Sequence, residues 1–298
     1  MLPARATERT RRIKSGSLAA LASMLVLMAF ATSGCILIYT HPPPDDPIPI
    51  PGWDANQYHL GKSIDALAER DKRLVSMQTP AVMEYTSGDQ HLKAKEKIIV
   101  RRPGDLRVEA MSPFGVALLL AAQGPDLAIF EPGQNRFMRG QANADTLYRY
   151  VRIPMAPTDA VGLLMGLAPP AFSLGGNVDS VSKDGAMAVA TYGNAAAGTR
   201  QLGFTSGNLA LVRETANTGQ VNYEVRYSDY HDIGGMMFPY LVDATFPAAG
   251  SHVTFRYLRP IVNGVVPDST FVLTPAPGAT MINISLDLDD EGAVSNES

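Results

Sequence analysis

The chain has 298 residues, of which 46% are hydrophobic and 18% are charged, so it can bury one large core or two modest ones and lacks the composition of a disordered protein. Its first fourteen residues hold five of the 25 basic residues but only one of the 29 acidic residues, so the remainder is acidic. An acidic body repels phosphate backbones, and no basic patch interleaved with aromatic residues offsets this repulsion. We therefore expect no nucleic-acid partner.

The amino-terminal segment has the pattern of a secretory signal peptide. A basic stretch is followed by an almost wholly apolar run over residues 18–30, which is shorter than the roughly 20 residues of a transmembrane helix. Two small residues stand directly before Cys35, as in the lipobox of bacterial lipoproteins, although Thr32 occupies the place where leucine is usual. The sequence predicts a signal peptide over residues 1–34 and an acylated Cys35 that binds membrane lipids.

Two alternatives to acylation stay open: an uncleaved signal anchor that continues through residues 36–38, or secretion with cleavage near Ala31. Both leave one unpaired thiol in an oxidising compartment, which is unusual, whereas acylation accounts for the single cysteine. In the lipoprotein class that this pattern resembles, an aspartate after the cysteine often causes retention in the inner membrane, and here Ile36 follows. We expect a lipid-anchored protein of the cell envelope, at the outer membrane and facing the periplasm.

Residues 35–53 are predicted to form the acylated cysteine and a tether. The stretch from 41 to 52 is dense in proline, which favours extended polyproline II of about 3 Å per residue and would hold the following domain off the lipid surface. Proline-rich runs can also be ligands for aromatic grooves, but directly after an acylated cysteine we favour the spacer. The domain itself is predicted over residues 54–288, and residues 289–298 form an acidic tail.

An amphipathic helix is predicted at the start of the domain. Charged residues surround apolar ones at helical spacing, and the helix should end before Thr79-Pro80, because proline disfavours helix in the residue before it. Two further helices are predicted over Asp159–Gly166, capped by Thr158, and over Ala144–Val151. The apolar positions of the first helix are Leu60, Ile64, Leu67 and Leu74.

Most of the remaining domain alternates apolar and polar residues with a period of two, which is typical of half-buried strands. Gly234-Gly235 is predicted to form a hairpin turn, with Met236 entering the next strand. The pattern predicts many antiparallel strands in one sheet. Because few helices can cover the apolar face of this sheet, the sheet should curl around its own side chains or around a hydrophobic ligand. The alternating stretches are 106–110, 221–227, 240–246, 253–257 and 282–288.

Short motifs between residues 105 and 169 resemble the LolA/LolB superfamily of lipoprotein carriers and receptors. In LolB-like members a strand ends in Ser/Asn-Pro-Leu-Gly, and here residues 112–115 read Ser-Pro-Phe-Gly. A strand with a turn at residues 124–126 follows, and a helix closes on a Leu-Gly-Leu-Pro-like segment over residues 163–169. At the carboxyl end residues 277–279, Pro-Gly-Ala, resemble LolA-like members more, so the resemblance is to the superfamily.

This resemblance implies a mainly β fold: an unclosed, strongly curved antiparallel β-barrel with a helical lid over a hydrophobic cavity. The cavity would shelter the acyl chains of other lipoproteins, brought by a periplasmic carrier. The loop Pro113-Phe114-Gly115 would insert its aromatic ring into the membrane, or else Phe114 packs in the core under residues 118–120. The candidate cavity-lining residues are Leu106, Val108, Leu118, Leu120, Tyr223, Val225, Val242 and Phe255.

The sequence contains no recognisable motif for catalysis or for a metal or cofactor. Its five histidines are scattered without metal-ligand spacing, and it contains no His-Glu-x-x-His, Gly-x-Ser-x-Gly or phosphate-binding glycine loop. The acidic residues 287–291 could bind calcium, but such a run is more often a solvated tail. We expect neither metal nor cofactor, and we favour a lipid-handling lipoprotein over a structural or sensing lipoprotein on the same scaffold. An enzyme is the least favoured alternative.

Overall fold

The computed structural model describes residues 55–172 and 177–284, apart from the side chains of residues 55–58 and 171. All described residues belong to one compact unit. The predicted signal peptide, Cys35, the tether and the acidic tail lie outside the described residues.

The described residues form one sheet of fifteen strands with the order β15-β6-β5-β4-β3-β2-β1-β13-β12-β11-β10-β9-β8-β7, to which β14 adds beside β1. Its neighbours pair antiparallel except β15 and β6, which are parallel. The strands are β1 (Ser76–Ser87), β2 (Gln90–Arg101), β3 (Asp105–Ser112), β4 (Gly115–Gln123), β5 (Asp126–Glu131), β6 (Arg136–Gln141), β7 (Ser180–Asp184), β8 (Met187–Asn194), β9 (Gly198–Thr205), β10 (Asn208–Thr215), β11 (Val221–Asp232), β12 (Met237–Phe246), β13 (Ser251–Tyr257), β14 (Ile261–Val262) and β15 (Thr280–Asn283).

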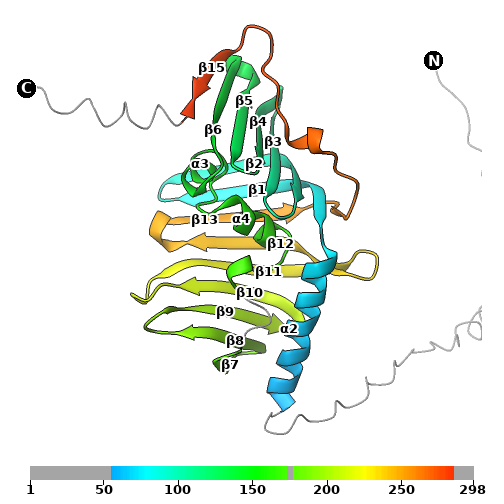
Figure 1. Cartoon of the computed structure of the whole chain (residues 1–298), viewed down its shortest axis with the longest axis vertical. Coiled ribbons are helices and arrows are strands. Elements are labelled where there is room, and N and C mark those ends of the chain that lie inside the picture. The colour runs from blue at the N-terminus through cyan, green and yellow to red at the C-terminus, as the bar shows by residue number, and fades with distance from the viewer. Residues whose placement is uncertain (1–54, 173–176, 285–298) are drawn as a thin grey trace, which may run out of the picture. The chain divides into compact units, whose positions relative to one another are not determined.

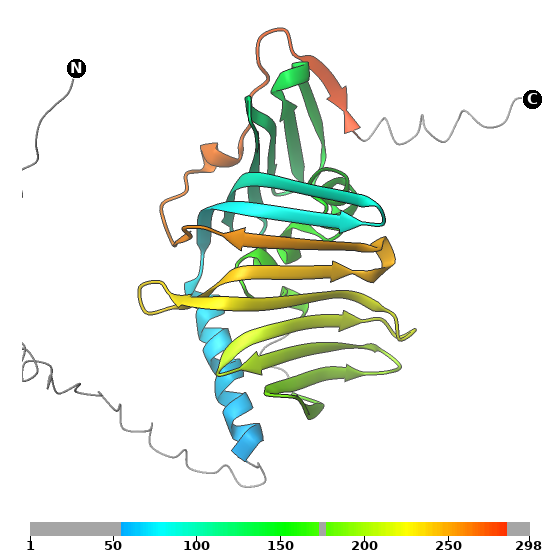
Figure 2. The same ribbon diagram turned by 180° about the vertical axis from the view of Figure 1, so that it is seen from behind.

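The sheet curves without closing, which confirms the predicted fold class. Strands β3 to β6 turn away from the direction followed by β1 and β7 to β13 (Figure 1), and β7 and β15 end the sheet without pairing with each other. Three α-helices, α2 (Ala55–Arg73), α3 (Ala144–Val151) and α4 (Pro157–Leu164), lie on one face of the sheet, which we call the inner face. Among the described residues, Figure 2 shows no α-helix on the opposite, outer face.

The core lies between the inner face and the helices. In β1 every second residue from Met77 to Tyr85 is buried, as expected for a strand with one apolar face. These residues share one hydrophobic cluster with Leu60 of α2, Leu147 of α3 and Leu163 of α4. A smaller cluster around Phe137 packs β4 and β6 against the carboxyl-terminal segment at Leu273.

The first helix ends earlier than the sequence predicted. Helix α2 stops at Arg73, and residues 76–87, including Thr79-Pro80, form β1 instead. The helical spacing of apolar residues suggested a longer helix because Leu74 is fully buried, although it lies outside α2. Pro80 is tolerated because it lies where β1 changes its partner from β14 to β13, so the ladder has a gap at that position.

Both shorter helices form, one with its predicted bounds and the other two residues earlier than predicted and with a different cap. Helix α3 spans Ala144–Val151, and the Asn143 side chain accepts a hydrogen bond from the Thr146 amide. Helix α4 begins at Pro157, so Thr158 lies inside its first turn and does not cap it. Proline suits this first position because its missing N–H is one that a helix leaves unpaired anyway.

At the hairpin Gly234-Gly235 both residues have positive φ, of 63° and 80°, as the predicted turn requires, and β12 begins at Met237. The last predicted strand, over 282–288, is described only as far as Ile284; β15 covers Thr280–Asn283 and lies parallel to β6, whereas antiparallel pairing was expected.

Candidate functional site

A small hollow lies between the inner face and the segment Arg152–Leu167, which contains α4 and which we call the lid. Its volume is about 20 Å³, and only apolar side chains line it. A cavity needs roughly 10–15 Å³ to hold one water, and apolar cavities of this kind stay dry. The lining residues are Ile153, Met155, Ala160, Leu163 and Leu164 from the lid, and Val225, Val242, Ala244, Phe246, Val253 and Phe255 from β11, β12 and β13.

Three of the eight predicted cavity residues, Val225, Val242 and Phe255, line this hollow. Leu106, Val108 and Leu120 are buried in the same core cluster but do not reach the hollow, while Leu118 and Tyr223 are half-buried against that cluster. The sequence placed these residues on the correct face, because strand alternation fixes the face. It did not predict which strands the lid covers, since that depends on where the chain between β6 and β7 packs.

The carboxyl-terminal end of the lid is held by polar side chains. Tyr227 Oη donates a hydrogen bond to the carbonyl of Leu163 at 3.1 Å, and Tyr257 Oη donates one to the carbonyl of Leu164 at 2.7 Å. Arg70 of α2 donates to the carbonyl of Gly166. The last carbonyls of a helix lack partners within the helix, so these three donors satisfy the end of α4.

Burial raises the pKa of the Tyr227 and Tyr257 hydroxyls well above their usual value, so both stay protonated donors at physiological pH. The other end of the lid is fastened differently. In residues 152–157 of the described chain no side chain forms a hydrogen bond to the sheet, and Ala156 at the start of α4 gives no side-chain cap. Arg152 holds this end to the sheet instead, since its guanidinium group lies over the ring of Tyr85 of β1, 5.4 Å from the ring centroid.

Phe114, between β3 and β4, is 100% exposed, so it does not pack under residues 118–120 as the alternative required. Ser112 Oγ accepts a hydrogen bond from the Phe114 amide at 3.2 Å and donates one to the carbonyl of Gly115 at 3.0 Å. Gly115 has φ +119°, a conformation that suits only glycine. The loop Pro113-Phe114-Gly115 thus presents its ring to solvent on a turn with a defined backbone.

One acidic side chain on the inner face was not singled out from the sequence. Glu96 of β2 lies between Ala81 of β1 and Ala110 of β3 in register, and its residue is only 9% exposed. Burial raises the pKa of its carboxyl group to about 7. The signal was present in the sequence, because Glu96 alternates with the buried residues Ile98 and Val100.

The described residues hold no group of three His, Cys, Asp or Glu side chains placed to bind a metal ion. In the same part of the chain no helix is long and apolar enough to cross a bilayer.

No family model and no curated protein matches this chain. Solved structures that it resembles include a DUF1329 family protein from Desulfovibrio piger, with 10% identity over 70% of this chain and 95% of that chain, at a TM-score of 0.49. A putative outer membrane lipoprotein-sorting protein domain from Vibrio parahaemolyticus has 9% identity over 70% of this chain and 95% of that chain, also at a TM-score of 0.49. A LolA superfamily protein from Nitrosomonas europaea has 12% identity over 74% and 99%, at 0.45.

The structural neighbours thus include a protein of the superfamily that the motifs between residues 105 and 169 resemble.

Proposed function

We propose that this chain is an envelope lipoprotein that binds acyl chains between the lid and the inner face and helps transfer or insert lipoproteins or lipids at the outer membrane. The observation that carries this proposal is the wholly apolar hollow under the lid, at the centre of a curved sheet whose inner face is otherwise buried. Two or three acyl chains on Cys35 would keep the protein at the membrane. A periplasmic carrier would bring the cargo.

Acyl-chain binding requires the lid to move, because a hollow of about 20 Å³ has no room for a chain. The acyl chain would displace the side chains of Ile153, Met155 and Leu163, which fill this space when the lid is closed. Each methylene gains about 0.8 kcal/mol on leaving water, whether it enters the protein or a bilayer. Transfer therefore needs no catalytic group and no nucleotide, only a pocket that holds the chain less tightly than the membrane does.

Delivery to the membrane would use Phe114. A phenylalanine side chain gains roughly 1.5–3 kcal/mol when it is fully removed from water. The ring is completely exposed on a backbone that Ser112 and Gly115 define, so entering lipid requires little rearrangement of the protein.

The closed hollow also favours a second candidate, a structural or sensing lipoprotein on the same scaffold. In this alternative the side chains of the lid fill the core permanently, and the loops contact another envelope protein. The two candidates differ in one measurable property, which is whether weakening the lid increases acyl-chain binding.

Tyr257→Phe in the full-length chain tests this difference, because it removes the hydrogen bond to Leu164 and leaves the packing of the ring. A buried hydrogen bond contributes about 1 kcal/mol, so the open population, and with it the affinity for an acyl chain, should rise roughly fivefold. The affinity would be measured with a fluorescently labelled, uncharged monoacylglycerol.

Tyr240→Phe is the matched control, since Tyr240 is a half-buried tyrosine of β12 that forms no hydrogen bond with the lid. It should leave the affinity unchanged. If Tyr257→Phe lowers stability by about 1 kcal/mol without increasing binding, or if neither protein binds the probe, the acyl-carrier proposal is wrong and the structural candidate is favoured.

A further inference from the structure

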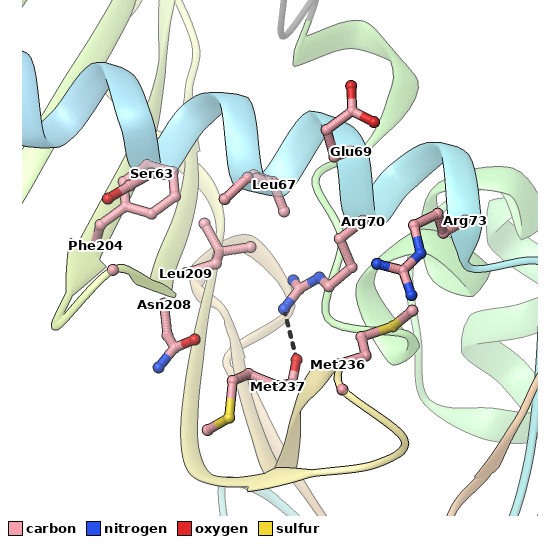
Figure 3. Close-up of a pocket in the computed structure, with 13 residues that line it drawn as sticks. Ser63, Leu67, Glu69, Arg70, Arg73, Phe204, Asn208, Leu209, Met236 and Met237 are labelled. Atoms are coloured by element: carbon pink, nitrogen blue, oxygen red, sulfur yellow. Dashed lines mark hydrogen bonds between the residues drawn. The ribbon is translucent and has the colours of Figure 1, made fainter. Parts of the chain in front are cut away.

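A second hollow lies beside α2 and shares no residue with the one under the lid (Figure 3). Its volume is about 310 Å³. Helix α2 forms one wall, and the turns between β9 and β10 and between β11 and β12 form the others. The side chains that matter below are Leu67, Arg70 and Arg73 from α2, Phe204 and Leu209 from the first hairpin, and Met236 from the second.

Two arginines of this hollow have no carboxylate partner. Arg70 donates to the carbonyl of Met237 at 3.2 Å and to that of Gly166, while its Nε is buried and has no hydrogen-bond partner. Arg73 is exposed, and its side chain forms no ion pair in the described part of the chain. A guanidinium group stays protonated at any physiological pH, so the hollow carries two uncompensated positive charges.

The nearby acidic side chains do not neutralise these charges. Glu69 lines the same hollow, but its carboxylate pairs with Lys72 at 2.7 Å and points away from Arg70 and Arg73 in Figure 3. Asp71 pairs with Arg102 at 3.1 Å. The hollow is thus positively charged, although the rest of the chain is acidic.

The wall continues along the helix and mixes apolar side chains with polar ones, including Asn208 near the arginines and His59 and Lys62 further along α2. A further hollow of about 490 Å³ shares Ser63, Ala66, Phe204 and Gly207 with the first and extends to Leu60. Leu60 and Arg70 are ten residues apart on α2, which corresponds to about 15 Å at 1.5 Å per residue. The two hollows form one groove, which we call the α2 groove, with Arg70 and Arg73 at one end and the apolar side chains of Leu67, Phe204 and Leu60 along its length.

We propose that the α2 groove binds an anionic amphiphile, with a phosphate head group at Arg70 and Arg73 and its apolar chain along Leu67 and Phe204. The guanidinium fork matches the geometry of phosphate oxygens and makes charge-assisted hydrogen bonds to them. The site and the lid cavity share no lining residue, and the test rests on Arg73, which does not contact the lid, in place of Arg70, which donates to the carbonyl of Gly166.

The test uses the full-length protein in phosphatidylcholine nanodiscs, titrated by calorimetry with dihexanoyl phosphatidylglycerol and, in parallel arms, with dihexanoyl phosphatidylcholine and with inorganic phosphate. Arg73→Gln should weaken binding of the anionic lipid about tenfold, because it removes one charge from the groove. Arg73 forms no side-chain interaction that the fold needs, so the variant should keep the melting temperature of the wild type.

Lys97→Gln is the matched control, since it removes the same charge from an exposed side chain of β2 that does not line the groove. It should leave the affinity unchanged, as should either substitution for the uncharged monoacylglycerol probe of the lid cavity. Equal weakening by both substitutions would mean general charge attraction and would overturn the site. Inorganic phosphate that binds as tightly as the anionic lipid would overturn its assignment to an amphiphile.

Discussion

The lid cavity and the α2 groove lie on the same side of one sheet and differ in what fills them. Under the lid, branched side chains from both walls meet and leave about 20 Å³ of dry space. Beside α2 the opposing wall consists of hairpin turns, and at Gly207 and Gly235 a Cβ atom would meet nothing within 4 Å, so about 310 Å³ stays open. Where apolar side chains of a helix pack against those of strands, the space between them closes. Where a helix faces turns that contain glycine, an open space remains that charged side chains can line.

The largest effect expected from this difference is on stability. Leu164→Ala should lower the free energy of unfolding by about 2–5 kcal/mol, because Leu164 is 4% exposed and the lost volume would enlarge a dry cavity. Met237→Ala in the α2 groove should lower it by less than about 1 kcal/mol, since that side chain is 39% exposed. Urea unfolding of both variants measures the contrast, and equal losses would contradict the picture of a closed and an open hollow.

The pH dependence of stability tests whether water reaches the inner face of the sheet. Burial raises the pKa of Glu96 from 4.5 to about 7 in the folded state. The folded state therefore holds its proton more tightly than the unfolded chain, so the contribution to stability is present below about pH 4.5 and is lost as the pH rises through 7. The loss amounts to about 3 kcal/mol between pH 4.5 and 8.

Glu96→Gln should remove this part of the pH dependence, as measured by urea unfolding at pH 5, 6, 7 and 8. Glu84→Gln serves as the control, because Glu84 is a half-buried residue of the neighbouring strand that pairs with Lys93 at 2.5 Å. An unchanged pH slope in the Glu96 variant would show that water reaches this carboxyl group.

The smallest effect on stability should come from the exposed turn, although its effect on membrane binding should be clear. Phe114→Ser should weaken binding to lipid vesicles by roughly ten- to a hundredfold, which corresponds to the 1.5–3 kcal/mol gained when the ring leaves water. Unfolding should change by no more than about 0.5 kcal/mol, because the ring contacts nothing that folding buries.

Val265→Ser provides the comparison for Phe114, since Val265 is an apolar side chain with 93% exposure on a different loop. Vesicle flotation or surface plasmon resonance measures both variants. If the two substitutions weaken binding equally, the turn at residues 113–115 has no special role at the membrane.

The sequence predicted the fold class and most strands because apolar and polar residues alternate with a period of two. This alternation shows which face of a strand is buried wherever only one face of the sheet is covered. It failed at residues 74–80, where a buried leucine extends a helical period into what is the start of β1. It also predicted only antiparallel pairing, because the parallel contact of β15 with β6 depends on a long return of the chain over the outer face.

The candidate site was predicted less completely, for a physical reason. Burial can be read from a periodic pattern, so Val225, Val242 and Phe255 were placed correctly on the inner face. The roles of Arg70, Tyr227 and Tyr257 depend on which carbonyls end α4, and no local pattern encodes a contact between residues as far apart as 70 and 166.

The unclosed sheet has one further consequence, at the margin formed by β7. A margin of this kind exposes backbone N–H and C=O groups that another extended polypeptide could pair with, which is a route to aggregation. Strand β7 is only five residues long, all exposed, and carries Lys183 and Asp184 at its end. Short length and charged side chains disfavour strand addition between copies, so the curved sheet can stay open without copies joining one another end to end.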